Sequence, residues 1–322
     1  MGTNRVESIL LVRRSAFTWI QRYQGVVSLA LLVLAASLFG SSREWFFQYA
    51  TVGTVAGQMA VIGVMAVGMT FVILTGGIDL SVGSMCALIG VCGAKLALGG
   101  HPLWHCAAAM LLLGALLGLI NGVLVAATTV QPFVITLASM ASLRGAAYLI
   151  SPNNVSGFPK LFEPFQGTVY GLPVNAVMLI SLVVLGWWIL RRTVFGRYVY
   201  AVGGNETACR YSAAPVARTK ILVYTINGIC VGLAAILLIA RTNNGEPGGA
   251  TAYELDAIAA VVIGGASLVG GYGSVVGTLF GAVFMQTLSH LMVLWGIGDK
   301  LALLLKGPII LAAVLLQANR RR

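Results

Sequence analysis

The chain has 322 residues, of which 58% are hydrophobic and only 9% are charged, and its mean hydropathy is +0.92. About 25% of the residues of a soluble domain are charged, so this composition excludes an ordinary soluble fold. The net charge of +11 would suit a nucleic-acid-binding protein, but the basic residues lie at the ends of apolar runs, as in membrane proteins. The composition therefore predicts a polytopic membrane protein and argues against nucleic acid as a partner.

The N-terminal part of the chain predicts a segment at the membrane surface followed by two spans. Residues 1–24 combine several arginines with apolar and aromatic residues, which is typical of a cytoplasmic segment lying along the interface. The apolar run Gly25–Gly40 ends without a small-residue cleavage motif, so we expect a retained first span rather than a signal peptide. The uncharged run Tyr49–Ile78 is long enough for a second crossing, since a membrane helix needs about 20 residues.

The second run ends in a glycine-containing motif, TGGIDLSVGS (Thr75–Ser84). Only Leu80–Ala94 is apolar before Lys95, too short a stretch for a straight crossing, so the pattern predicts a broken or tilted helix. The motif holds Asp79, the strongest candidate for a carboxylate inside the membrane, which must face the protein interior or a wet cavity. We therefore assign to a candidate translocation pathway Gly76, Gly77, Asp79 and Ser81.

Small residues and one cation mark the next two spans. The uncharged run Leu103–Val130 has glycines spaced so that another helix can approach closely, namely Gly114, Gly118 and Gly122. Pro132 is typical of the first turn of a helix, and Arg144 falls near the middle of the helix that it opens. A cation at that depth is costly unless it faces water or a partner, so Arg144 joins the candidate pathway residues.

A long polar interruption, residues 191–220, follows a predicted outer loop at 151–172 and a span. It carries one acid, Glu206, against several cations, which the positive-inside rule places in the cytoplasm: Arg191, Arg192, Arg197, Arg210, Arg218 and Lys220. A break at Gly203 and Gly204, an N-cap at Asn205, and the Glu206 and Arg210 pair predict a short helix, Glu206–Tyr211. Such a loop could dock on another protein; the alternative is a basic connector that faces lipid.

The last part of the chain predicts three further crossings, one of them broken. Ile221–Ala240 returns outward, and Arg241–Asp256 predicts an acidic outer loop. The uncharged run Ala257–Gly298 is interrupted by Gly264–Gly273, so a short helix followed by a full one is expected, and Gly264 and Gly265 join the candidate pathway. Leu301–Gln317 returns to three terminal arginines.

These patterns predict an all-α fold of about ten transmembrane helices, some short or broken, with cytoplasmic termini and one domain over residues 1–322. The glycine breaks leave half-length helices whose backbone must be buried in protein or line a wet cavity, and transporters handle polar solutes at such places. Simple helix packing is the alternative. No phosphate-binding loop motif occurs, so another chain must bind ATP if ATP drives transport. His101 and His105 share a helical face without a carboxylate, and we expect no metal site.

Four segments resemble the permease subunits of ribose-type sugar ABC importers, in a larger group with branched-chain amino acid permeases. They are VGMTFVILTGGIDLSVGS (67–84), VQPFVITLASMASLRG (130–145), FGRYVYAVGGNETACRYSAAPVARTK (195–220) and ELDAIAAVVIGGASLVGGYGSVVGTLFGA (254–282). The resemblance implies that the region from Gly203 to Pro215 docks on the ATPase, through Gly203, Gly204, Asn205, Glu206, Arg210 and Pro215. This chain departs from the family at Ala213, where a glycine is usual.

The main hypothesis is therefore a permease subunit that is not itself an enzyme, has no cofactor of its own, and lies in the inner membrane in contact with lipid. The resemblance implies an ATPase that binds ATP, a periplasmic sugar-binding protein, and a second permease chain that is either identical or different. The substrate would be a ribose-like pentose, a hexose, or a related polyol or furanose. The alternatives are a branched-chain amino acid permease of the same fold, or an ion-coupled secondary transporter or channel that uses Asp79 and Arg144.

Overall fold

A computed structural model describes residues 49–298, 301–302, 304–308 and 311. The predicted interfacial segment, the first span Gly25–Gly40, the terminal arginines and most of the last span lie outside the described residues. Ten helices have defined bounds: α4 (Tyr49–Leu74), α5 (Val82–Leu98), α6 (Leu103–Ala127), α7 (Pro132–Ile150), α8 (Val174–Arg192), α9 (Val194–Gly204), α10 (Glu206–Tyr211), α11 (Val216–Thr242), α12 (Tyr253–Ile263) and α13 (Val275–Leu294).

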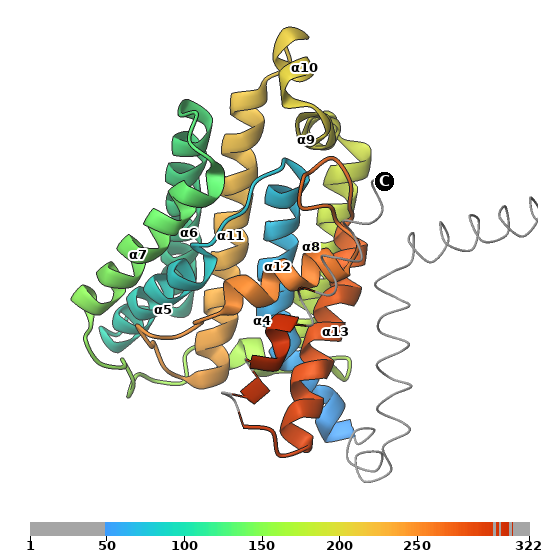
Figure 1. Ribbon diagram of the computed structural model, residues 1–322. Coiled ribbons are helices and arrows are strands. Elements are labelled where there is room, and N and C mark those ends of the chain that lie inside the picture. Colours follow the sequence, from blue (N-terminus) through green and yellow to red (C-terminus); the bar gives the residue numbers. More distant parts are fainter. Residues whose placement is uncertain (1–48, 299–300, 303, 309–310, 312–322) are drawn as a thin grey trace, which may run out of the picture.

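Within the described part of the chain, six helices are long and apolar enough to cross a membrane: α4, α6, α7, α8, α11 and α13. This confirms a helical, polytopic membrane protein. The helix α5 has 17 residues and α12 has 11, so the two predicted interruptions do produce short helices. In Figure 1, α12 lies across the direction in which α4, α11 and α13 run.

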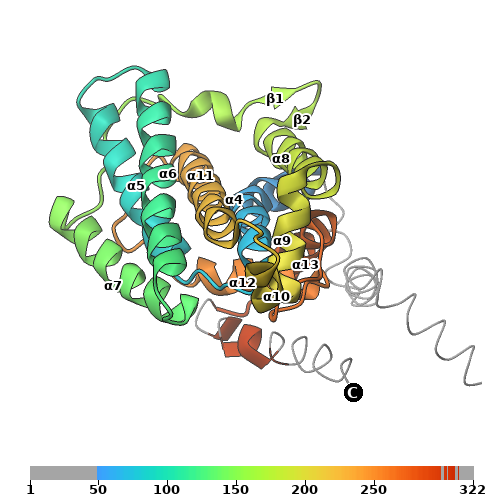
Figure 2. The ribbon, with the colours of Figure 1, turned by 90° about the horizontal axis from the view of Figure 1, so that it is seen from above.

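The helices α4 and α11 form the centre of the molecule. About 78% of the apolar window of α4 is buried, against 11% for α7, so α4 is enclosed by protein while α7 is peripheral. Viewed from above, α5, α6 and α7 lie on one side of this centre, and α8 and α13 lie on the other (Figure 2). The core therefore forms around the second predicted span.

Glycines let α6 and α11 approach closely, as the sequence predicted. A Cβ atom added at Gly114 or Gly118 would overlap the carbonyl oxygen of Gly228 or Tyr224 on α11. The same kind of contact joins α12 to α13, where Gly264 meets Gly277. These glycines are required because the backbones themselves are in contact.

The predicted outer loop contains a little regular structure, so the fold is not purely α-helical. A 3₁₀ turn, η1 (Glu163–Gln166), precedes an antiparallel hairpin of two short strands, β1 (Thr168–Val169) and β2 (Leu172–Pro173). Tyr170 and Gly171 between the strands have φ values of 51° and 78°. Positive φ at both central residues is the geometry of a tight type I′ hairpin turn, which glycine favours.

The prediction of an acidic outer loop at 241–256 is wrong at its C-terminal end. The helix α12 begins at Tyr253, before the expected start at Ala257, and it includes both Glu254 and Asp256. Asp256 is buried and pairs with Lys306 at 2.9 Å. Lys306, 50 residues further along the chain, compensates the charge of Asp256, so this carboxylate can be buried.

Candidate functional site

The helix α10 forms where the sequence placed it. The Oδ1 atom of Asn205 accepts a hydrogen bond from the Ala208 amide at 2.8 Å, which is the predicted N-cap. Glu206 and Arg210 form the predicted ion pair across one turn, at 2.8 Å. The helix lies at one extremity of the molecule, beyond the ends of the long helices (Figure 1). Its position suits contact with another protein.

A second ion pair, which local spacing could not reveal, ties α10 to the start of α11. Lys220 lies 2.8 Å from Glu206. Partial burial opposes ionisation of Glu206, but the hydrogen bonds and charges of Lys220 and Arg210 outweigh it and lower the pKa of the carboxyl group. Glu206 is therefore charged at neutral pH and anchors α10. The Arg210 side chain remains 61% exposed, so it is accessible to a partner.

The turn between α10 and α11 contains the one noted departure from the family pattern. Ala213 has a φ of 56°, in the left-handed region that glycine adopts most easily. The alanine therefore keeps the conformation that a glycine would favour, at some cost in strain. Pro215 follows as the N-cap residue of α11, so it fixes the point at which the polar segment ends.

The polar segment 191–220 also contains a helix that the sequence reading missed. The helix α9 covers Val194–Gly204, and the Thr193 hydroxyl caps it by accepting from the Gly196 amide at 3.1 Å. Its apolar residues Val199 and Val202 are buried. A threonine before a run with buried residues at helical spacing was the available signal.

The glycines of α9 and of the two predicted breaks meet at one place, below α10. A Cβ atom at Gly203 would overlap the carbonyl oxygen of Leu74, and one at Gly270 would lie 2.8 Å from the Gly76 nitrogen and 2.9 Å from the Cα of Gly203. The Gly271 amide donates to the Leu74 carbonyl at 3.0 Å. Three segments far apart in the sequence thus contact one another backbone to backbone.

Side chains reinforce this junction. The Tyr200 hydroxyl on α9 donates to the Gly273 carbonyl at 2.9 Å. Next to the junction, the hydroxyls of Thr70 and Thr278 lie 2.7 Å apart and join α4 to α13. The helix α9 is therefore packed closely against both glycine segments, with few side chains between the backbones.

The predicted pathway glycines are not all at the junction. Gly76 is, with a φ of 79°. Gly77 instead faces the Tyr224 hydroxyl on α11, and Gly264 packs on α13. Gly265 has a φ of 94° and open space where a Cβ would be. Within the second break, Gly270 and Gly271 are the residues that contact the first break. They follow Gly264 and Gly265, the pair that the sequence analysis assigned to the pathway, by a few residues.

Asp79 lies fully buried, in the interior as predicted. Its Oδ1 accepts from the amide and the hydroxyl of Ser81, at 2.9 and 2.6 Å, and its Oδ2 accepts from the Asn227 side-chain amide at 2.9 Å. The network continues outward, since Asn121 donates to the Ser81 hydroxyl at 2.9 Å and Ser139 donates to Asn121 at 2.6 Å. Asp79 therefore joins the first break to α11, α6 and α7.

Polar residues inside apolar runs were the missed signal for this network. Asn121 and Asn227 are almost completely buried, and such residues in membrane helices are usually paired across helices. Thr136 on α7 adds a direct clamp, because its hydroxyl donates to the Ile78 carbonyl at 3.0 Å and accepts from the Leu80 amide at 3.2 Å. Thr136 thereby provides partners for two backbone groups of the non-helical stretch before α5.

Arg144 contacts a different element from Asp79. Its guanidinium donates to the carbonyl oxygens of Pro247 and Gly249, each at 2.8 Å, in the loop that precedes α12. Two backbone carbonyl dipoles thus stabilise the half-buried cation. The two charged residues predicted for the pathway therefore hold different parts of the chain: Asp79 holds the first break, and Arg144 holds the loop that leads into the short helix α12.

Comparisons with known proteins agree with the motif resemblance. A family model described as branched-chain amino acid transport system / permease component matches residues 51–314. The ribose import permease protein RbsC of Escherichia coli strain K12 is 39% identical over 310 residues, covering 94% of this chain and 95% of that protein. RbsC of Bacillus subtilis strain 168 is 38% identical over 314 residues, covering 94% of each chain.

A third relative has a different named cargo. The autoinducer 2 import system permease protein LsrD of Yersinia enterocolitica is 35% identical over 303 residues, covering 91% of this chain and 92% of that protein. No solved structure gives a significant match. Because the family model covers most of the chain and these relatives align along nearly all of it, the chain belongs to this family of transport-system permease components.

Proposed function

We propose that this chain is the membrane-spanning subunit of an ABC importer that carries a monosaccharide, or a related furanose, across the inner membrane. The relatives named for ribose and autoinducer 2 import support this substrate class over branched-chain amino acids. The single structural observation that carries the proposal is the junction below α10. It connects an exposed helix, suited to docking, with both interrupted segments of the membrane region.

In this proposal, residues 191–220 form the coupling segment on the cytoplasmic side, and α10 docks on a separate ATPase subunit that binds ATP. Gly204, Asn205, Glu206 and Arg210 form or flank the docking helix, and Pro215 ends the segment. Movement of α10 is passed through α9 and Gly203 to Gly76 and Gly270. A rigid lever with few intervening side chains suits this role, because it must transmit force and then return.

The interrupted segments would form the translocation pathway. We assign it Gly76, Gly77, Asp79, Ser81, Arg144, Gly264 and Gly265, in a single domain of about ten spans with residues 1–24 and both termini in the cytoplasm. Backbone at membrane depth that is not helical is tolerated where it is buried or lines a cavity. Asp79 holds the first segment in place, and Arg144 holds the loop that leads into α12, through the hydrogen bonds described above. A periplasmic sugar-binding protein would deliver the substrate, and a second permease chain would complete the pathway.

An ion-coupled secondary transporter is less well supported. Such a mechanism usually relies on ionisable residues that exchange protons or ions with a cavity. Asp79 is fully buried and accepts three hydrogen bonds, and Arg144 contacts backbone carbonyls elsewhere. The hydrogen bonds of both side chains therefore favour a structural role over ion exchange with a cavity.

The test is uptake of labelled ribose, other pentoses, hexoses and leucine into vesicles that hold the complete complex. We expect uptake of one or more sugars that needs both ATP and the binding protein, with no uptake of leucine. Uptake driven by an ion gradient without ATP would contradict the proposal. Uptake of leucine alone would establish the amino acid alternative.

A further inference from the structure

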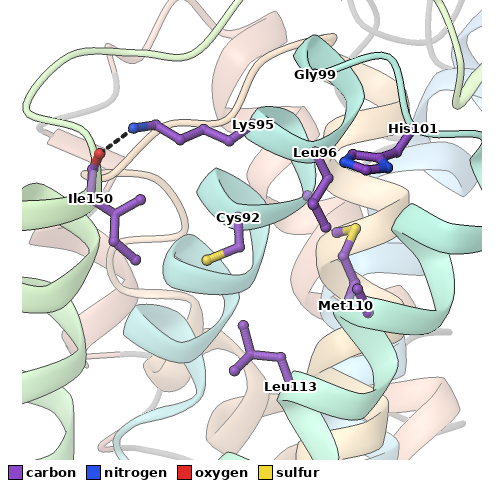
Figure 3. Close-up of a pocket in the computed structure, with 10 residues that line it drawn as sticks. Cys92, Lys95, Leu96, Gly99, His101, Met110, Leu113 and Ile150 are labelled. Carbon is purple, nitrogen blue, oxygen red and sulfur yellow. Dashed lines mark hydrogen bonds between the residues drawn. The ribbon is translucent and has the colours of Figure 1, made fainter.

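A cavity of about 490 Å³ lies between α5, α6 and the end of α7, on the side of the molecule away from α10 (Figures 1 and 3). Its deeper part is apolar, and its rim carries two basic side chains. The lining residues are Cys92, Gly93, Lys95, Leu96, Gly99, His101, Ala109, Met110, Leu113 and Ile150. The carboxylates of the described chain are all absent from this lining.

Lys95 is the exposed cation of this rim and has one acceptor within the protein. Lys95 lies in the last turn of α5, and its Nζ donates to the carbonyl oxygen of Ile150, which ends α7 (Figure 3). An ammonium group has three donors, so two remain for another acceptor. No ion pair forms between Lys95 and a carboxylate among the described residues. His101 lies at the same rim and adds an imidazole.

The surroundings of the cavity are those of a membrane boundary. Trp104, which is 66% exposed, stacks on the ring of His105 with the ring centroids 3.9 Å apart. Exposed tryptophan is typical of the level of the lipid headgroups. The nearby side chains Leu98 and Leu112 are largely exposed, as expected for helices that face acyl chains.

We propose that this cavity binds an anionic phospholipid, with one acyl chain against Leu96, Met110 and Leu113 and the headgroup phosphate at Lys95 and His101. An apolar slot that ends in a cation at the headgroup level matches both parts of such a molecule. A sugar would leave most of its hydroxyls unpaired against this lining. Alternatively, Lys95 could serve only to cap α7 through its bond to the Ile150 carbonyl. That role would use one of its three donors and would not explain the apolar cavity next to it.

The test measures lipid binding to the full-length chain in detergent by native mass spectrometry. The probes are phosphatidylglycerol, phosphatidylcholine with the same acyl chains, and glycerol phosphate as a headgroup without chains. We expect phosphatidylglycerol to bind about five-fold more tightly than phosphatidylcholine, the effect of one lysine near an anionic surface. Glycerol phosphate should bind far more weakly than either lipid.

Two sets of variants test separately the charge of Lys95 and the space inside the cavity. Lys95→Met should remove the five-fold preference, whereas Lys95→Arg and Lys160→Met, an exposed lysine of the outer loop away from the cavity, should retain it. Ala109→Leu fills the slot and should weaken both lipids, whereas Ala108→Leu, at an exposed neighbouring position, should not.

Three results would overturn the proposal: equal binding of the two lipids to the wild type, a preference that survives Lys95→Met, or lipid binding that Ala109→Leu leaves unchanged. The first of these is also the result expected if another part of the chain or a second permease copy fills the cavity. Tight binding of glycerol phosphate alone would show an anion site without a lipid. The Ala109 and Ala108 pair decides the question even if Lys95→Met fails to fold.

Discussion

Among single residues, Asp79 is a buried acceptor on which several hydrogen bonds converge. Three donors converge on its carboxylate in a fully buried place, and two of them belong to Ser81. Removing the acceptor leaves these donors unpaired, and each buried unpaired group costs about 1–3 kcal/mol. Asp79 therefore stabilises the first break whatever its part in transport.

We predict that Asp79→Leu lowers the free energy of unfolding by at least ~2 kcal/mol and impairs uptake, since the donors cannot reach water. Asp79→Asn should be milder, because the Asn227 amide can rotate to offer its oxygen to the new amide. Thermal unfolding in detergent and vesicle uptake measure both effects. Normal stability and uptake in the leucine variant would remove Asp79 from the structure of the pathway and from its function.

Glu206 is a second single residue with a predicted effect, because its contribution to the stability of α10 depends on pH. Its pKa is lowered in the folded protein despite partial burial, by the hydrogen bonds and charges of Lys220 and Arg210. A lowered carboxyl pKa stabilises the fold at pH values above the ordinary value of 4.5, and this stabilisation is lost as pH falls through the lower folded value.

We therefore predict that α10 is more protected from hydrogen exchange in the wild type than in Glu206→Gln at pH 7. The difference should shrink as the pH falls below 4.5 and disappear below the lowered pKa of the folded protein. Exchange of the amides of residues 206–211, corrected for the intrinsic rate, measures this. Equal protection at pH 7 would mean that the ion pairs do not hold the helix.

Among the elements, α9 and its two terminal glycines offer a matched pair of positions. Gly203 touches the backbone of α4, whereas a Cβ at the adjacent Gly204 meets nothing within 4 Å. Both residues belong to the helix, so alanine suits the backbone at either position. Both backbones lie at the junction, and the two positions differ in whether an added Cβ atom would overlap it.

We predict that Gly203→Ala displaces α9 from Leu74 and lowers stability by about 1–3 kcal/mol, the usual cost of overpacking. Gly204→Ala should leave stability unchanged or raise it slightly. Thermal unfolding in detergent and coupled uptake measure both variants. If Gly203→Ala behaved like its neighbour, the backbone contact with α4 would be too loose to transmit movement.

Several elements could be predicted closely because their signals lie in residues that are near one another in the sequence. The N-cap at Asn205, the proline at the start of α7 and the interruptions around α5 and α12 all depend on residues a few positions apart. The pairing of Lys220 with Glu206 and of Lys306 with Asp256 joins residues whose separation no periodicity encodes. The predicted start of α12 is wrong for the same reason. Glu254 and Asp256 suggested a loop, because the sequence pattern does not show that Lys306 pairs with Asp256.

At the scale of the whole molecule, the exposed helix α10 lies at one end, next to α9, which contacts both interrupted segments through its backbone. The segments of the junction are separated by most of the sequence, yet Gly203 touches both Leu74 and the loop that contains Gly270. The sequence motifs identified each segment as important. Only the fold brings α9 and the two interruptions together, which is why the motifs predicted the parts of the site but not their connection.

The last prediction concerns this connection and the proposed ATPase. Arg210 is largely exposed, and its ion pair with Glu206 is worth a few tenths of a kcal/mol, because Lys220 also neutralises Glu206. Arg210→Glu should therefore leave the chain folded and inserted, with thermal unfolding near that of the wild type. Its effect must come from the partner surface, so we expect loss of ATPase co-purification or ATP hydrolysis without uptake. Asn205→Ala, which removes the side-chain cap of α10 but keeps the hydrogen bond from the Asn205 amide to the Ala201 carbonyl, should impair coupling in the same way. Lys160→Glu, at an exposed position outside residues 191–220, serves as a charge-reversal control and should couple normally. Wild-type uptake and co-purification in both α10 variants would make this helix a passive connector, and the junction beneath it would then be a packing feature without a role in coupling.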